Sequence, residues 1–392
     1  MVTSRPVVFT LVFGAAASIC GPSASRAQGT PIRATLELVA PTLPDSATVY
    51  VAGSVPALGN WIPGSIKLLP VGDHTWRVSI TLDRATSIEY KFTRGSWERE
   101  AADASGAALK NLVARVSTDT VLTTTVRDWT SGARRRVLDG TVTGTLRYHR
   151  AVKSAGLADR DLVVWLPPDY DAAPRKRYPV LYMLDGQNVF DPATSSFGTD
   201  WAVDEAVDSL IRHRIIGPMI VVGINSTVNR SAEYLPGTTG TAHMEFMLRT
   251  VKPLIDRTYR TRPSAGTTFV GGSSAGGIAA FMLVWEHPDV FSRALAFSPA
   301  FQAPAGSTMA LDYVPNVSGA ARPPKRVRFY IDIGGEGLED QLRPGVDAMV
   351  LALKARGYRE GADFRLVTEP SAEHAEIAWR RRFPAALVWA LR

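Results

Sequence analysis

The chain has two regions that differ in the spacing of their hydrophobic positions. Between residues 35 and 126, short runs rich in Val, Thr and aromatic residues alternate with turn residues, at 48–52, 76–80, 88–92 and 121–126. Several short strands at this spacing predict an all-β, immunoglobulin-like sandwich over residues 30–128. Residues 129–140, which include three consecutive arginines, are expected to form a linker.

From residue 141 to residue 392 the pattern changes. Hydrophobic runs recur at 162–166, 180–184, 219–223, 267–271, 294–297, 327–331 and 364–367. Between many of them lie segments with apolar residues at helical spacing, such as 204–214 and 346–356. This alternation predicts a mostly parallel sheet with helices on both faces. The expected fold class is therefore an all-β sandwich followed by an α/β domain.

The first residues have the pattern of an export signal. Arg5 precedes an apolar or small stretch at 7–19, and Ser25 and Ala27 place small residues before Gln28. We expect a signal peptide over residues 1–27 and a secreted or periplasmic protein with no membrane anchor after cleavage. The single cysteine, Cys20, lies in this segment, so the cleaved chain would have neither thiol chemistry nor a Cys-based metal site.

Composition and charge narrow the class of protein. Hydrophobic residues make up 45% of the chain and charged residues 21%, which suits folded domains with sizeable cores and excludes a disordered or disulfide-dense protein. The formal charge is +7, but the basic residues are scattered and no nucleic-acid-binding motif accompanies them, so we expect no nucleic-acid partner. The sequence shows no metal-ligand cluster, phosphate loop or dinucleotide fingerprint, so we expect no metal and no cofactor.

The segment 272–276 reads Gly-Ser-Ser-Ala-Gly and matches G-x-S-x-G with Ser274 at its centre. A predicted strand precedes it and a helix-like segment, 278–283, follows, which is the context in which this motif presents a nucleophile. A serine at the tip of such a turn has strained backbone angles, so its neighbours must be small. The turn also directs the free N–H groups of the helix start at the reacting centre. Ser274 is therefore the predicted nucleophile.

A serine hydroxyl needs a base, and the base needs a carboxylate to orient it. His374 follows the last predicted strand and precedes the last helix, the position from which this type of sheet supplies its base. The acid is expected on the loop 334–340 after the penultimate strand. Glu336 is the best candidate because it is closest to the strand end, with Glu339 and Asp340 as alternatives.

A tetrahedral oxyanion requires two N–H donors. One is expected from Ala275, directly after the nucleophile, and the other from the loop 184–188 after an earlier central strand.

Six segments of the second region, in this order, resemble the esterase family that includes enterochelin esterases, feruloyl esterases and S-formylglutathione hydrolases. They are 178–188, 222–225, 230–234, 252–256, 272–277 and 374–379. The resemblance implies an α/β-hydrolase fold, hydrolysis of carboxylic esters, and the N–H of Gln187 as the second oxyanion donor. The acid of this family often follows a Gly-Thr-x-Glu/Asp pattern, whereas this chain has the shorter Gly334-Gly335-Glu336.

The first region resembles the starch-binding carbohydrate-binding modules of family 20 over residues 32–126. The resemblance rests on the segments 53–61 and 89–92 together with Trp76 and Trp97. It implies that Trp61 and Trp97 form a stacking platform for sugar rings and that Lys91 is a hydrogen-bonding partner. Trp76 is expected to pack in the core, the commoner role of a tryptophan in a β-sandwich.

These expectations combine into a secreted serine esterase with an α-glucan or related polysaccharide as partner and a carbohydrate-linked ester as substrate. Two alternatives stay open. One is a siderophore esterase or an acyltransferase that uses the same triad. The other is a polysaccharide-binding protein whose second region has no catalytic activity.

Overall fold

The computed structural model describes residues 31–392 except 60–62, 83–84, 97–98, 105, 107–108, 110, 131–141, 197 and 305–309. The expected signal peptide, Trp61, Trp97 and residues 131–140 of the expected linker therefore lie outside the described residues. Among the helices that are described, none combines the length and the apolar character that crossing a bilayer requires.

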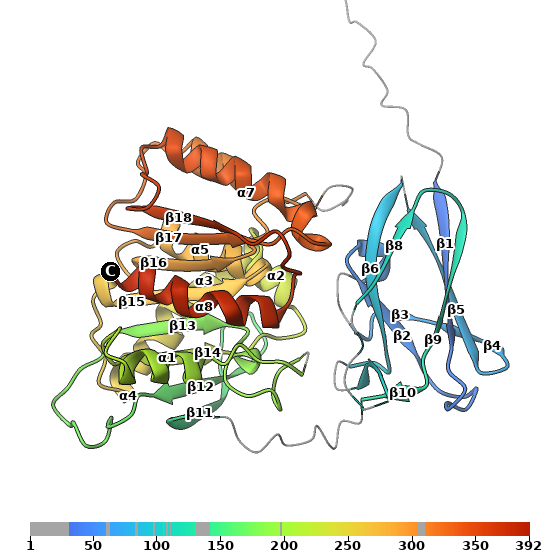
Figure 1. Ribbon diagram of the computed structural model, residues 1–392, viewed down its shortest axis with the longest axis horizontal. Coiled ribbons are helices and arrows are strands. Elements are labelled where there is room, and N and C mark those ends of the chain that lie inside the picture. Colours follow the sequence, from blue (N-terminus) through green and yellow to red (C-terminus); the bar gives the residue numbers. More distant parts are fainter. Residues whose placement is uncertain are drawn as a thin grey trace, which may run out of the picture.

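The N-terminal region folds into two four-stranded sheets and a short two-stranded ribbon (Figure 1). The first sheet has the order β4-β5-β1-β9, with β1 Ile32–Val39, β4 Leu69–Gly72, β5 Thr75–Leu82 and β9 Thr120–Thr125. The second has the order β3-β2-β6-β8, with β2 Tyr50–Gly53, β3 Ile66–Lys67, β6 Thr86–Thr93 and β8 Leu112–Val116. The ribbon pairs β7 Ala101–Ala102 with β10 Asp128–Trp129. The predicted all-β fold of this region is confirmed.

Alternating side chains of the two sheets form the core of this region. Trp76 is fully buried, as predicted, and its Nε1 donates to the backbone oxygen of Ala47 at 3.0 Å. Strand β1 was not among the predicted strands, although every second side chain in it is buried. Its outward positions include Arg33 and Glu37, which lower the local hydrophobicity while the inward face still packs.

The C-terminal region is built on an eight-stranded sheet of order β11-β12-β14-β13-β15-β16-β17-β18. The strands are β11 Thr145–Val152, β12 Arg160–Leu166, β13 Val180–Leu184, β14 Ile220–Ile224, β15 Thr268–Ser273, β16 Arg293–Phe297, β17 Arg328–Ile333 and β18 Phe364–Thr368. β12 is antiparallel to both neighbours and all later pairings are parallel. The predicted mostly parallel sheet is confirmed. The edge strand β11 was not predicted, because half of its residues are exposed and its pattern is weakly apolar.

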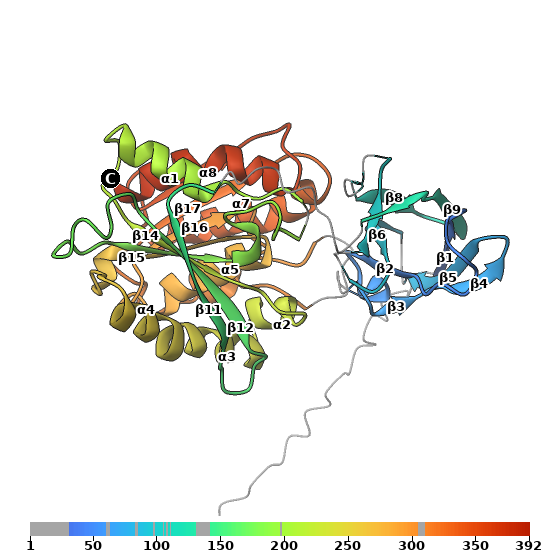
Figure 2. The same ribbon diagram turned by 90° about the horizontal axis from the view of Figure 1, so that it is seen from below.

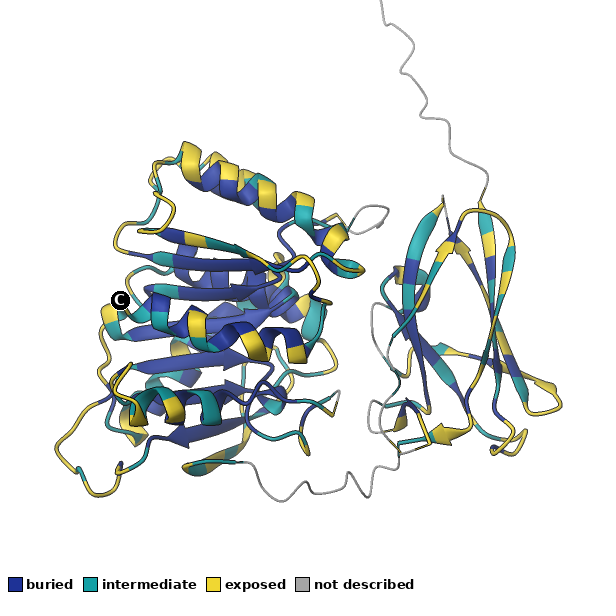
Figure 3. Ribbon diagram, viewed as in Figure 1, coloured by how far each residue is buried: buried dark blue, intermediate teal, exposed yellow. Residues whose placement is uncertain are grey.

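Helices cover both faces of this sheet (Figures 1 and 2). α1 Val203–Arg212 and α8 Glu376–Leu391 pack on one face. The other face is covered by α3 Thr238–Phe246, α4 Lys252–Thr258, α5 Ala275–Glu286, α6 Val314–Ser318 and α7 Leu338–Ala355. The short helix α2 Arg230–Tyr234 contacts α3 and α5. The central strands are buried on both faces (Figure 3), which explains their continuous hydrophobic runs.

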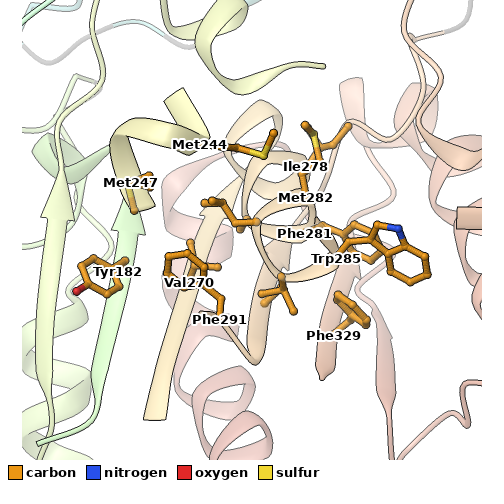
Figure 4. Close-up of a cluster of buried hydrophobic side chains, with 14 of the residues drawn as sticks. Tyr182, Met244, Met247, Val270, Ile278, Phe281, Met282, Trp285, Phe291 and Phe329 are labelled. Atoms are coloured by element: carbon orange, nitrogen blue, oxygen red, sulfur yellow. The ribbon is translucent and has the colours of Figure 1, made fainter. Parts of the chain in front are cut away.

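α5, the helix that follows the predicted nucleophile, is buried along nearly its whole length. Each residue from Ala275 to Trp285 is buried. Figure 4 shows Phe281 and Trp285 of this helix beside Phe329 of β17. The ring of Phe281 stacks on Trp285 and lies 4.5 Å from the ring of Phe329, centroid to centroid. The turn that precedes α5 is therefore attached to a rigid, densely packed element.

Candidate active site

The carboxyl ends of the parallel strands meet at one edge of the sheet, where sites of open α/β folds form. The strand register aligns Ser273 with Phe297 of β16, and Phe297 with Asp332 of β17. The residues that follow these strands, including Ser274 and Ser298, therefore lie along the same edge. His374 reaches it from the loop between β18 and α8.

Ser274 occupies a strained turn between β15 and α5. Its backbone angles, φ 57° and ψ −121°, are unfavourable for a residue with a side chain. Hydrogen bonds hold the turn: the N–H of Ser274 donates to Phe297 at 2.9 Å, and the carbonyl of Ser274 accepts from the N–H of Ala300 at 3.2 Å. A Cβ on Gly272 would lie 2.8 Å from the carbonyl oxygen of Gly276, so this position requires glycine. The predicted strand-turn-helix context of Ser274 is confirmed.

His374 and Glu339 form an ion-pair-type contact at this edge. Nδ1 of His374 lies 2.9 Å from Oε1 of Glu339, whose side chain is fully buried. The other carboxylate oxygen accepts the N–H of Gly334 at 2.7 Å. Burial alone would raise the pKa of Glu339, but hydrogen bonds from His374, Ser298 and Gly334 and the charge of His374 hold it below its usual value. The Glu339 carboxylate is therefore held in its charged form, in which it can orient the imidazole of His374.

The favoured acid, Glu336, is not the carboxylate that contacts His374. Glu336 lies exposed on the loop before α7, and the alternative Asp340 is exposed as well. Glu339 sits in the first turn of α7, so the helix turns its side chain inward. A sequence signal existed for this choice, because Glu339 shares the helical spacing of the buried positions Leu342, Val346, Met349 and Leu353.

Two further residues enclose the His374–Glu339 pair and were missed from the sequence. The Ser298 hydroxyl is hydrogen-bonded to Glu339 and accepts Nε1 of Trp379 at 2.9 Å. The ring of Trp379 lies edge-on to the imidazole of His374, with centroids 4.9 Å apart and planes at 87°. These contacts fix the orientation of the imidazole. The contacts of Ser298 join residues that are far apart in the sequence, which explains why no local pattern revealed this residue.

The expected oxyanion donors lie on two adjacent turns. Gln187 is part of the 3-10 turn Gly186–Asn188 after β13. The turn lies against β14 so closely that a Cβ on Gly186 would be 2.4 Å from the backbone of Gly223. The Gln187 side chain is tied to Ser226 by hydrogen bonds of 2.8 and 3.0 Å. Ala275 is the first residue of α5, and first-turn N–H groups have no partner within their helix.

A second buried carboxyl group lies close to His374. Nδ2 of Asn188, the residue after Gln187, is 3.4 Å from Oε1 of Glu376 at the start of α8. Burial raises the pKa of Glu376 to about 7. The Asn188 side chain also accepts the N–H of Ser196 at 2.8 Å, so it links the oxyanion turn to both flanking loops.

Among the described residues, the one acidic group with metal-ligand spacing consists of Asp200, Asp204 and Glu205, with oxygen atoms within 4.8 Å of one another. Asp200 faces Arg380 at 3.5 Å. Burial and a hydrogen bond with Glu205 raise the pKa of Asp204 to about 8.

The expected sugar-binding residues of the N-terminal region are described in part. The Lys91 side chain is buried, and its Nζ lies 2.6 Å from Oε2 of Glu100, which is fully buried. A hydrogen bond from Lys91 to a sugar remains a prediction. It would have to be made by an ammonium group that already balances a buried carboxylate.

Family comparisons agree with both halves of the fold. The Esterase family model matches residues 157–390, and the starch binding domain model matches residues 32–119. An amylopullulanase of Thermoanaerobacter thermohydrosulfuricus is 30% identical over 103 residues, which is 25% of this chain and 7% of that protein. An endo-1,4-beta-xylanase/feruloyl esterase of Xylanibacter ruminicola is 28% identical over 231 residues, 56% of this chain and 27% of that protein. The matched part of this chain spans about a quarter or less of the length of these two longer relatives.

Solved structures resemble the chain at low sequence identity. A ferulic acid esterase superposes with a TM-score of 0.52 at 20% identity, covering 64% of this chain and 99% of that one. The enterobactin esterase of Shigella flexneri superposes with a TM-score of 0.53 at 14% identity, covering 90% of this chain and 92% of that one. These likenesses confirm the predicted fold class. Because the Esterase family model covers more than half of the sequence, this chain belongs to the esterase family, and its N-terminal region is a match to a starch-binding domain.

Proposed function

We propose that the protein is a serine esterase in which Ser274 is the nucleophile, His374 the general base and Glu339 the acid that orients His374. The observation that carries this proposal is the 2.9 Å contact between His374 and Glu339 at the sheet edge that also presents the strained Ser274 turn. A buried carboxylate on one imidazole nitrogen leaves the other nitrogen to exchange a proton with a hydroxyl. Membership of the esterase family supports this reading.

The proposed reaction has two steps. Ser274 Oγ attacks the ester carbonyl carbon while Nε2 of His374 takes the hydroxyl proton, and the tetrahedral oxyanion is stabilised by the N–H groups of Gln187 and Ala275. The C–O bond to the alcohol then breaks, and His374 returns the proton to the departing alkoxide. Water, deprotonated by His374, attacks the acyl-enzyme and releases the acid and free Ser274.

The substrate that we favour is an ester carried on a polysaccharide or oligosaccharide. The starch-binding domain match supports a polysaccharide partner, and tethering raises the local concentration of esters attached to that polymer. The structural neighbours include ferulic acid esterases, and one relative is named an endo-1,4-beta-xylanase/feruloyl esterase. Export through the expected signal peptide would bring the enzyme to such polymers.

Turnover of p-nitrophenyl acetate and butyrate tests the catalytic part. Wild type is expected to hydrolyse at least one of them, and Ser274→Ala is expected to reduce kcat by about 10⁴-fold or more, since loss of a triad nucleophile has that effect. Ser209→Ala, an exposed serine on α1, serves as the matched control and should behave as wild type. Equal rates for wild type and Ser274→Ala would refute the proposal and leave a polysaccharide-binding protein as the better description.

Retention on insoluble starch tests the binding part. We expect wild type to be retained, and Trp61→Ala or Trp97→Ala to weaken binding by about 10-fold, as expected for the loss of one aromatic stacking contact. Tyr148→Ala, which removes an exposed aromatic ring from the esterase region, is the control. Retention unchanged in both tryptophan variants would remove the starch-binding proposal without affecting the esterase assay.

One observation keeps a siderophore esterase in view as a second candidate. The superposition with the enterobactin esterase covers 90% of this chain, so it extends over the N-terminal region as well as the esterase region. A screen of acetylated, feruloylated and siderophore esters separates the two candidates. A kcat/KM highest for a siderophore ester, together with no retention on starch, would favour the second.

A further inference from the structure

The mechanism proposed above does not use Arg230, yet its guanidinium contacts both turns that carry the predicted oxyanion donors. Nε and Nη2 of Arg230 each lie 2.7 Å from a different carboxylate oxygen of Asp185. Nη2 also lies 3.2 Å from the backbone oxygen of Ser273. Asp185 comes just before Gly186 and Gln187, and Ser273 comes just before Ser274 and Ala275. One side chain therefore links the two halves of the site.

On the Ser273 side, the contact fixes a peptide unit that leads into the nucleophile. The carbonyl of the Ser273–Ser274 peptide accepts from Arg230, while the N–H of the same peptide donates to Phe297 at 2.9 Å. The plane of this peptide is held from both sides. The orientation of the next peptide, whose N–H belongs to Ala275, depends on it, because Ser274 has the strained angles given above.

On the Asp185 side, the contact holds a second strained residue. Asp185 has φ 59° and ψ 48°, the left-handed region that costs a non-glycine residue free energy. Its side chain is gripped by the two nitrogens of Arg230, and its N–H donates to the hydroxyl of Tyr234 at 3.2 Å. Such a conformation persists only where the surroundings impose it. Here both restraints come from α2.

α2 is itself held in place by contacts with strand β12 and with the loop that precedes the helix. Glu233 of this helix forms a buried ion pair with Arg160 of β12, with Nη1 and Oε2 2.7 Å apart. The other oxygen of Glu233 accepts the hydroxyl of Thr227 at 2.8 Å. Arg230 therefore connects the two oxyanion turns to the sheet through a short, pinned helix.

We propose that Arg230 is a positioning residue that sets the separation and orientation of the Gln187 and Ala275 N–H groups. This inference rests on the proposed function and deepens it. Charge alone is insufficient for this role, because a planar fork is needed to hold both oxygens of Asp185 and the Ser273 carbonyl together. A lysine at position 230 keeps the charge but cannot make the three contacts.

The test compares Arg230→Lys with Arg359→Lys. Arg359 also grips an aspartate, Asp363, with two nitrogens at 2.9 and 3.3 Å, but it precedes β18 and lies at the opposite edge of the sheet. Misplaced oxyanion donors are expected to lower kcat of Arg230→Lys by about 10- to 100-fold, while KM changes by less than about 3-fold. A trifluoromethyl ketone, which forms a tetrahedral adduct on serine, should bind more weakly by about the same factor as kcat/KM falls. Arg359→Lys should match wild type in each measurement.

Chemical rescue separates positioning from a general loss of folding. Added millimolar guanidinium is expected to restore part of the kcat of Arg230→Ala without changing its melting temperature, and to leave wild type unaffected. Tyr234→Phe, which keeps the ring and removes only the acceptor for the Asp185 N–H, should lower kcat by about 3- to 10-fold in a folded protein.

Three results would overturn the inference: kcat of Arg230→Lys equal to that of Arg359→Lys, inhibitor binding that does not follow kcat/KM, or a loss of activity that only tracks a loss of folded protein and shows no rescue. The Ser274→Ala variant in the same assay keeps the two proposals distinct. If wild type is faster than Ser274→Ala and Arg230→Lys is as active as wild type, only the proposed role of Arg230 is refuted. Wild type no faster than Ser274→Ala refutes both.

Discussion

Three positions separate Glu336 from Glu339, and the difference in their surroundings is large. Glu336 faces solvent, where its charge is screened. Glu339 is fully buried and bonded to His374, Ser298 and Gly334, so its charge acts in a low-dielectric setting. For a carboxylate that must hold one tautomer of an imidazole, the surroundings are decisive, whereas distance from the strand end along the sequence is a poor guide.

At the residue scale, we predict that Glu339→Gln lowers kcat by about 10²- to 10⁴-fold, because an amide at this position no longer stabilises the charged imidazole. Glu336→Gln should retain wild-type kcat. The measurement is ester turnover per active site, counted by complete labelling with an organophosphonate. If Glu336→Gln were the impaired variant and Glu339→Gln the active one, the assignment of the acid would be reversed.

At the scale of elements, glycines allow turns to approach strands closely enough to place the site. Gly186 brings the oxyanion turn against β14, and Gly277 brings α5 within 2.9 Å of the Phe297 carbonyl, as measured from an added Cβ. At the start of α1, the carboxyl groups of Asp204 and Glu205 lie close together. Asp204 also accepts a hydrogen bond from the N–H of Thr143 at 2.6 Å. Burial of Asp204 has a consequence for stability.

We predict that Asp204→Asn gains stability relative to wild type as pH rises from about 4 to 8, because the stabilising contribution of Asp204 is lost over this range. The folded-state pKa of Asp204 is about 8, above the ordinary value of 3.8, so folding takes up a proton in this window and each pH unit costs up to about 1.4 kcal/mol. The melting temperature of Asp204→Asn relative to wild type should therefore increase from pH 4 to pH 8 and then level off. Asp347→Asn, an exposed residue of α7, is the control. A difference that does not change with pH would contradict the prediction.

At the scale of the molecule, the two regions have separate hydrophobic cores. The buried cluster of the β-sandwich contains residues between Ala34 and Val126, whereas the large clusters on the two faces of the α/β sheet begin at Leu162 and Val163. The buried residues of each of these clusters come from one region of the chain. Stability and chemistry can therefore be changed in one region while the other is left intact.

We predict two unfolding transitions in calorimetry of the full chain. Leu36→Ala, in the fully buried core of the β-sandwich, should destabilise one transition by about 2 to 5 kcal/mol and leave turnover of a soluble ester unchanged. Leu283→Ala, in the equally buried α5, should shift the other transition and reduce activity. A single transition that both variants shift equally would show that the regions unfold together.

The sequence by itself determined the division into an all-β region and an α/β region, the strand-turn-helix setting of Ser274, and the position of His374 between the last strand and the last helix. These features follow from local patterns: hydrophobic periodicity, small residues at a tight turn, and the sequential order of elements in a parallel sheet. The tertiary structure decided that Glu339 contacts His374, that Ser298 and Trp379 enclose the pair, and that Arg230 joins two turns. Those choices depend on which side chain a helix turns inward and on contacts between residues more than thirty positions apart, for which the periodicity of a single segment contains no information.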